Sequence, residues 1–137
     1  MKELSFRLSY GDCDTVGIAY FAIYYRWMER AYSGWLYDHG LRSGEMVESL
    51  GVLTVGAHSE CTYVRMVRVF DELTVRLVLD RVGTTSYTVG FDFVRDGDVV
   101  THGAMTFVCR EPGSGGKKAV PERLLAVLRT LPAPVTT

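Results

Sequence analysis

The chain has 137 residues with 47% hydrophobic and 23% charged side chains, and its formal net charge at pH 7 is -1. This length and composition predict one soluble globular domain over residues 1–137. The balanced charge argues against nucleic acid as a partner, and no apolar run approaches the roughly 20 residues that cross a bilayer, so no membrane partner is expected.

The first predicted elements are a β-strand and a long helix. Apolar and polar residues alternate from Glu3 to Tyr10, which is the period of a strand that is buried on one face. From about Phe21 to His39 the apolar residues recur every three or four positions, which predicts a helix, and Gly40 is expected to end it. Apolar groups nearly encircle the first turns of this helix, so we expect a sheet to wrap around it.

The remainder of the chain is predicted to be mainly β-structure. Residues 43–50 are expected to form a short helix with Ser43 as its cap, and residues 52–69 a long extended stretch. Alternating strands follow at residues 73–79 and 87–93, and a hairpin turn at Asp96-Gly97. The last predicted elements are a strand over residues 99–109 and an amphipathic helix that begins at Pro121 and ends before Pro132.

This order predicts an α+β fold. Each strand has one apolar face that needs cover, so the simplest packing is a five-stranded antiparallel sheet wrapped around the long central helix. A small sheet with exposed edges also favours pairing with a second copy. We therefore expect a homodimer or a homotetramer.

The three cysteines, Cys13, Cys61 and Cys109, are an odd number without a C-x-x-C pair. This argues against a disulfide framework or a zinc site and predicts a reducing, cytoplasmic location. No metal or organic cofactor is expected. Cys13 itself is interpreted as structural, because the neighbouring anionic Asp14 raises the pKa of a thiol and so disfavours the reactive thiolate.

The most informative segment is residues 10–27, YGDCDTVGIAYFAIYYRW, between the first strand and the long helix. It contains Asp12 and Asp14, bracketed by Gly11 and Gly17, which can adopt backbone angles that a side chain forbids. A carboxylate near a helix start lies close to unpaired backbone N–H groups and to the positive end of the helix dipole. A base or nucleophile beside such N–H groups suits acyl chemistry.

With this motif in place, the chain resembles the hot-dog-fold thioesterases, specifically the 4-hydroxybenzoyl-CoA and YbgC-like acyl-CoA thioesterase group. The family pattern is an aromatic residue, an acid two residues later, D-x-x-G, an apolar-aromatic run, a Tyr and an aromatic residue. In this chain the pattern consists of Tyr10, Asp12, Asp14-Thr15-Val16-Gly17, Ile18-Ala19-Tyr20, Tyr24 and Trp27. Weaker family marks follow at residues 70–73, 83–86 and 120–121.

The resemblance implies a hot-dog fold and hydrolysis of an acyl thioester of coenzyme A (CoA) or of acyl carrier protein. It implies that Asp14 is the catalytic carboxylate, acting either as a nucleophile through a mixed anhydride or as a general base for water. The implied oxyanion donor is the backbone N–H of Phe21 at the start of the central helix. The implied substrate-binding residues are Tyr10, Gly17, Tyr20, Tyr24 and Trp27.

The chain also departs from the family pattern. Phe21 stands where some relatives carry His, and Ile23 stands where many carry Asn or Ser. Hydroxybenzoyl-CoA enzymes place basic residues around Gly83 to Thr85 to grip nucleotide phosphates, and this chain has none there, which argues against that substrate. Certain polyketide-processing relatives lack the catalytic acid, and Asp14 separates this chain from them.

Other interpretations stay open. Asp12 and Asp14 have a spacing that can hold a divalent metal, Asp14 can also cap the helix, and Asp12 is interpreted mainly as structural support. The aromatic residues of the motif can fill the core instead of stacking on an acyl group. Lys117 and Lys118 can contact phosphates of the carrier. The alternative function is a non-catalytic hot-dog module that binds acyl-CoA or acyl carrier protein.

Overall fold

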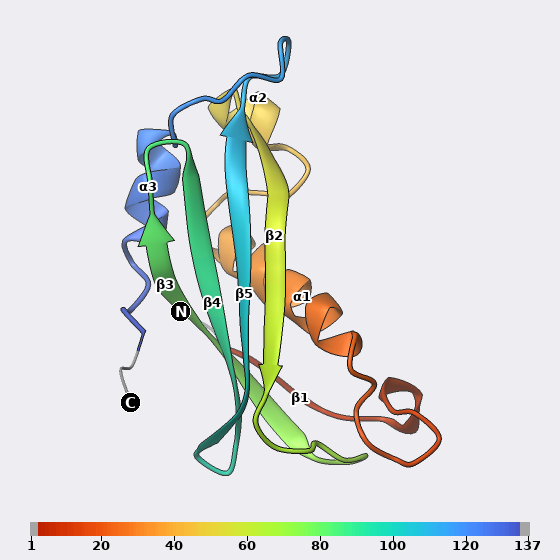
Figure 1. Cartoon of the computed structure of the whole chain (residues 1–137). Coiled ribbons are helices and arrows are strands. Elements are labelled where there is room, and N and C mark those ends of the chain that lie inside the picture. Colours follow the sequence, from red (N-terminus) through yellow and green to blue (C-terminus); the bar gives the residue numbers. More distant parts are fainter. Residues whose placement is uncertain (1–2, 135–137) are drawn as a thin grey trace.

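The computed structural model of the protein describes residues 3–134 (Figure 1). The elements follow the predicted order, with one additional 3-10 helix, η1, between the first strand and the long helix. They are β1 (Leu4–Arg7), η1 (Tyr10–Asp12), α1 (Ile23–Asp38), α2 (Met46–Leu50), β2 (Leu53–Tyr63), β3 (Glu72–Val82), β4 (Ser86–Arg95), β5 (Asp98–Arg110) and α3 (Glu122–Leu128).

The five strands form one antiparallel sheet in the order β1-β3-β4-β5-β2. α1 lies against one face of this sheet, and α3 lies beside β3 (Figure 1). The alternating residues of β4 that face α1 are fully buried, as their period predicts: Tyr87, Val89, Phe91 and Phe93. The predicted α+β fold, a five-stranded antiparallel sheet wrapped around a central helix, is confirmed.

Close packing of α1 on the sheet depends on a glycine in β5. A Cβ atom at Gly103 would collide with the sulfur of Met28, a fully buried residue of α1. Gly103 therefore lets the helix approach the strand more closely than any larger residue would. The buried face of α1 carries the three- and four-residue spacing read from the sequence: Tyr24, Trp27, Met28, Ala31, Tyr32, Trp35 and Leu36.

The second half of α1 packs against the sheet through a sealed aromatic cluster, which we call the closed end. The hydroxyl groups of Tyr32 and Tyr87 form a buried hydrogen bond of 2.7 Å. The ring of Phe107 stacks on both tyrosines, with centroid distances of 4.6 Å to Tyr32 and 5.4 Å to Tyr87. Each polar atom of the tyrosine pair thus has a partner in a site without water access, as burial requires.

Two predicted boundaries are wrong. Ser43 does not cap α2, which begins at Met46, because the Ser43 hydroxyl is hydrogen-bonded to Ser33 of α1 at 2.9 Å. The extended stretch predicted over residues 52–69 is also too long, since β2 ends at Tyr63. The hairpin at Asp96-Gly97 is confirmed: both residues have positive φ, as a two-residue hairpin turn requires.

Candidate functional site

Asp14 lies in a tight turn that its own side chain stabilises. The N–H of Gly17 donates to Asp14 O at 3.1 Å, and Gly17 has a φ of 78°, which favours glycine. The N–H of Val16 donates to Asp14 Oδ1 at 3.0 Å. Asp14 does not cap α1: the capping position is Ala22, without a side-chain hydrogen bond, so this alternative is wrong.

Asp12 has a different and purely local partner. Its Oδ2 atom accepts hydrogen bonds from the N–H of Ser9 at 2.9 Å and from the Ser9 hydroxyl at 3.3 Å. These bonds fix the start of η1. The carboxylate is thereby engaged, in agreement with the interpretation of Asp12 as structural support.

The loop that carries Asp14 is bound to the chain segment after β2. Residues 13–19, here called the Asp14 loop, close on themselves through the Asp14 N–H, which donates to Ile18 O at 3.0 Å. The Ala19 N–H donates to Val67 O at 2.7 Å, and the Val69 N–H donates to Gly17 O at 3.0 Å. Residues 64–71, the 64–71 connection, therefore form the wall that holds the acid loop in place.

An apolar groove of about 250 Å³ opens beside this loop at the N-terminal end of α1. We call it the α1 groove; it is lined by Ile18, Ala19, Phe21, Tyr24 and residues 63–67. The Tyr63 hydroxyl donates to Phe21 O at 2.6 Å, and the Tyr20 N–H donates to Asp12 O at 3.0 Å. Among residues 3–134 the Phe21 N–H has no acceptor, so it is available to a ligand oxygen.

The remaining predicted residues have unlike surroundings. Tyr24 is almost fully buried yet contributes to the α1 groove. Trp27 is buried against Phe6, with ring centroids 4.8 Å apart, so the core interpretation holds for this residue. Tyr10 and Tyr20 are exposed, and the Tyr20 ring lies 4.8 Å from that of Phe21, its neighbour in the chain.

The sequence did not reveal Tyr63 and Arg65 as groove residues. Both follow from the β2 register and from the path of the 64–71 connection, which no local motif encodes. Asp14 is half-buried and does not line the groove itself, but its backbone is hydrogen-bonded to Ile18, which does.

Cys13, which precedes Asp14, has a raised thiol pKa. Burial is the main cause, followed by the anionic Asp12 and Asp14, and the raised pKa disfavours the reactive thiolate.

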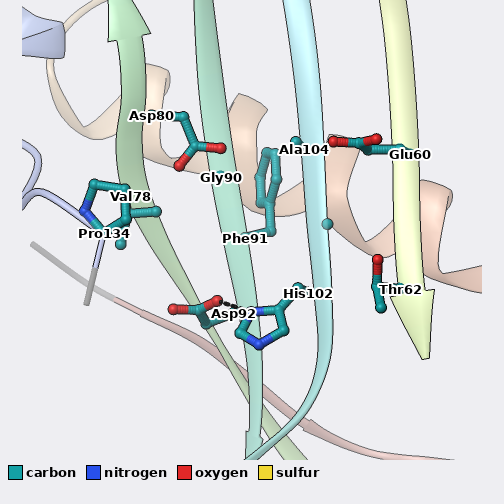
Figure 2. Close-up of a pocket in the computed structure, with 11 residues that line it drawn as sticks. Glu60, Thr62, Val78, Asp80, Gly90, Phe91, Asp92, His102, Ala104 and Pro134 are labelled. Carbon is teal, nitrogen blue, oxygen red and sulfur yellow. Dashed lines mark hydrogen bonds and ion pairs between the residues drawn. The ribbon is translucent and has the colours of Figure 1, made fainter. Parts of the chain in front are cut away.

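A second hollow lies on the sheet face opposite α1 (Figure 2). There Asp92 Oδ1 lies 2.8 Å from His102 Nδ1, and Asp80 stands over Gly90, where a Cβ atom would be only 2.6 Å from Asp80 Oδ1. Burial, with Asp92 and Glu60 nearby, raises the pKa of Asp80. None of the residues predicted for the site lies in this hollow.

Two kinds of feature are absent from the described part of the chain. Residues 3–134 contain no cluster of three or more His, Cys, Asp or Glu side chains arranged to hold a metal ion, so Asp12 and Asp14 belong to no such cluster there. No helix over the same residues has the length and apolar character that a membrane span needs.

Known proteins resemble this chain in sequence. The sequence model of the thioesterase-like superfamily matches residues 8–128. A 1,4-dihydroxy-2-naphthoyl-CoA hydrolase of Synechococcus sp. (strain CC9605) is 26% identical over an alignment of 125 residues that covers 88% of this chain and 84% of that protein.

Solved structures share the fold at lower identity. A 1,4-dihydroxy-2-naphthoyl-CoA thioesterase from Synechocystis superposes with a TM-score of 0.84 at 16% identity, over 96% of this chain and 98% of the other. A dynemicin thioesterase, studied for polyene binding, has a TM-score of 0.81 at 23% identity, over 97% and 98% of the two chains. The expected hot-dog fold is therefore confirmed.

Proposed function

The chain belongs to the thioesterase-like superfamily, and on this premise we propose that it hydrolyses the thioester of an acyl-CoA to the free acid and the thiol. The observation that carries the proposal is the Asp14 loop, bound by backbone hydrogen bonds beside an apolar groove at the start of α1. An acyl carrier protein is the alternative carrier. We propose a cytoplasmic location on the cysteine usage alone.

Asp14 is the proposed catalytic carboxylate, with Oδ2 as its reactive atom. Oδ1 already accepts the Val16 N–H, whereas Oδ2 has no hydrogen-bond partner among the described residues. As a general base, Oδ2 takes a proton from water while the water oxygen attacks the carbonyl carbon, and the thiol leaves with a proton as the C–S bond breaks. As a nucleophile, Oδ2 attacks that carbon itself and the sulfur leaves as a thiolate; water then hydrolyses the mixed anhydride to the free acid and the Asp14 carboxylate.

The Phe21 N–H is the proposed donor to the thioester oxygen. The Tyr20 N–H bond to Asp12 O and the Tyr63 hydroxyl bond to Phe21 O hold the chain on both sides of this N–H group. The group also lies just before α1, where the helix dipole favours negative charge. One such donor lowers the barrier by about 3 kcal/mol, because it meets charge that develops in the transition state.

We propose a flat, conjugated acyl group as the substrate class. The naphthoyl and polyene groups named for two relatives have this shape. In this chain, Tyr20 and Phe21 expose adjacent aromatic rings beside the groove, and Tyr24 lines it. Tyr10 and Gly17 are proposed to contact the substrate from the Asp14 side, while Trp27 supports Tyr24 from the core at a ring distance of 5.1 Å.

We also propose that the protein is a homodimer joined along β2, with a homotetramer as the larger alternative. β2 is an edge strand of 11 residues, of which all but two are exposed. Its exposed residues include Leu53, Val55 and Tyr63. A long exposed edge strand that carries apolar side chains is normally covered by another chain, since it otherwise promotes aggregation. If analytical ultracentrifugation at micromolar concentration shows that the protein sediments as a monomer, this proposal is wrong.

Thiol release from aromatic, polyene and straight-chain acyl-CoAs, beside one carrier-bound substrate, tests the proposed function. Asp14→Asn should reduce kcat by ~10²- to 10⁴-fold, because Asn keeps the acceptor for Val16 N–H but loses the base. Asp12→Asn is the matched control and should keep the wild-type rate. Equal rates in wild type and Asp14→Asn would remove Asp14 from the mechanism. Tight acyl-CoA binding without thiol release would favour the non-catalytic binding module.

A further inference from the structure

Two arginines of the 64–71 connection flank the α1 groove. Arg65 lines the groove directly, and Arg68 is paired by a β-bridge with Ile18, another lining residue. Both arginines are exposed. Among residues 3–134 no carboxylate lies within ion-pair distance of either guanidinium group, and neither group donates a hydrogen bond. Arg65 therefore presents positive charge and unused donors at the groove, and Arg68 carries the same groups on the backbone next to Ile18.

The acid of the same connection is already engaged. Asp71 Oδ2 accepts a hydrogen bond from Arg95 Nη1 at 2.8 Å and another from the backbone N–H of Arg68 at 2.8 Å. Its charge is thus balanced by Arg95, which leaves the side chains of Arg65 and Arg68 uncompensated. At the far edge of the sheet, by contrast, Arg7 forms an ion pair with Glu72 at 2.8 Å.

Backbone hydrogen bonds fix the position of the two arginines. The Arg65 N–H donates to Val100 O at 3.0 Å, and Arg95 Nη1 donates to Met66 O at 2.9 Å. Val67, between the two arginines, accepts the Ala19 N–H. The guanidinium groups thus project from a backbone that is bound to β5, to β4 and to the Asp14 loop.

Other basic groups are less suited to hold a substrate phosphate. The turn at Gly83 to Thr85 carries no basic residue, and Lys118 is already paired with Glu111 at 3.3 Å and with Gly51 O at 3.2 Å. Arginine, in contrast, offers a planar set of donors that matches phosphate oxygens.

We propose that Arg65 and Arg68 bind a phosphate of the thiol carrier while its acyl group enters the α1 groove. This inference rests on the proposed thioesterase function. The shared chemistry is a phosphate ester, which both CoA and the phosphopantetheine arm of a carrier protein possess.

The test compares the double variant Arg65→Gln/Arg68→Gln with wild type on three thioesters of one acyl group: CoA, phosphopantetheine and phosphate-free N-acetylcysteamine. We expect KM for acyl-CoA to rise about 10-fold with kcat retained, because charged hydrogen bonds to phosphate are lost. KM for the phosphate-free thioester should not change. Arg129→Gln, an exposed arginine just after α3, is the matched control and should leave every KM unchanged.

Each outcome decides the proposal. A higher KM for both phosphate-bearing thioesters would show that the two arginines bind the phosphate of the pantetheine arm. A higher KM for acyl-CoA alone would show that they bind the nucleotide phosphates. An unchanged KM for acyl-CoA, or an equal rise for the phosphate-free thioester, overturns it. If wild type hydrolyses no thioester, the proposed function fails. Calorimetry with free CoA then still tests phosphate binding by Arg65 and Arg68. About 10-fold weaker binding of CoA by the double variant supports the proposal, and equal binding refutes it.

Discussion

The two ends of α1 carry aromatic residues in opposite surroundings. At the N-terminal, open end Phe21 is 64% exposed and Tyr63 is 46% exposed, although they share a hydrogen bond. At the closed end Tyr32 is 5% exposed and Phe107 is 8% exposed. The same residue types therefore serve stability where the sheet covers them and remain available to a ligand where it does not.

The difference follows from what lies over each end. The closed end is covered by β4 and β5, two inner strands of the sheet, where the paired residues Tyr87 and Phe107 face α1. The open end lies against Tyr63, the last residue of β2, and against the 64–71 connection, whose side chains Val64 and Met66 are themselves exposed. Substitutions at the closed end should consequently lower stability, whereas substitutions at the open end should mainly alter activity.

The largest expected contrast is between two phenylalanines. Phe107→Ala removes a ring that stacks on two buried tyrosines, and should lower the free energy of unfolding by about 3–5 kcal/mol. Phe21→Ala removes an exposed ring and should change it by no more than about 0.5 kcal/mol. Urea denaturation of both variants measures the contrast, and equal losses would refute it.

A smaller effect is expected from the tyrosine pair. Tyr87→Phe leaves the buried Tyr32 hydroxyl without its partner, so the free energy of unfolding should fall by about 1–3 kcal/mol. The double variant Tyr32→Phe/Tyr87→Phe should recover part of this loss, because no hydroxyl is then left unpaired. Thermal denaturation of the three proteins checks both statements, and a double variant less stable than Tyr87→Phe would contradict them.

The Tyr32–Tyr87 pair also makes the free energy of unfolding depend on pH. Burial raises the pKa of Tyr32 and Tyr87 above the ordinary value of 10.0, so the folded state keeps the protons that the unfolded chain loses. The pair's contribution is therefore complete below pH ~10 and is lost as the pH rises further. The double variant should lose less stability than wild type between about pH 9 and pH 11 in urea denaturation.

The smallest effect is expected at the open end. Tyr63→Phe removes the hydroxyl that donates to Phe21 O and should lower the free energy of unfolding by only about 0.5–1 kcal/mol, since the site is exposed. It should also lower kcat about 5-fold with KM unchanged, because the Phe21 backbone would be less well held. Tyr37→Phe, an exposed tyrosine of α1, is the control and should alter neither quantity.

The sequence predicted the fold well because its signals are local and periodic. The alternation of Tyr87, Val89, Phe91 and Phe93 is the pattern that the inner face of β4 requires. The hairpin at Asp96-Gly97 likewise depends only on the backbone preferences of two adjacent residues. Ser43 was misjudged as a cap because its hydroxyl finds a partner on α1, and that tertiary contact leaves no trace in the local sequence.

The site was only partly predictable for the same reason. The motif around Asp14 and Gly17 is contiguous, so its turn could be anticipated. Trp27 belongs to the same motif yet is buried, because helical spacing directs its side chain towards Phe93 and the core. Arg65 joins the site through the fold alone, since more than forty residues separate it from the acid.

The hydrogen bonds between the Asp14 loop and the 64–71 connection join two distant stretches into one cooperative unit. The two segments are expected to open together, because the Ala19–Val67 and Val69–Gly17 hydrogen bonds each hold the other in register. A local opening would therefore release the acid and Arg68 in a single event, while Arg65 stays bound to β5 through its N–H bond to Val100 O. The amide hydrogens of Ala19 and Val69 would then report one common free energy of opening in hydrogen exchange, lower than that of the sheet beneath them.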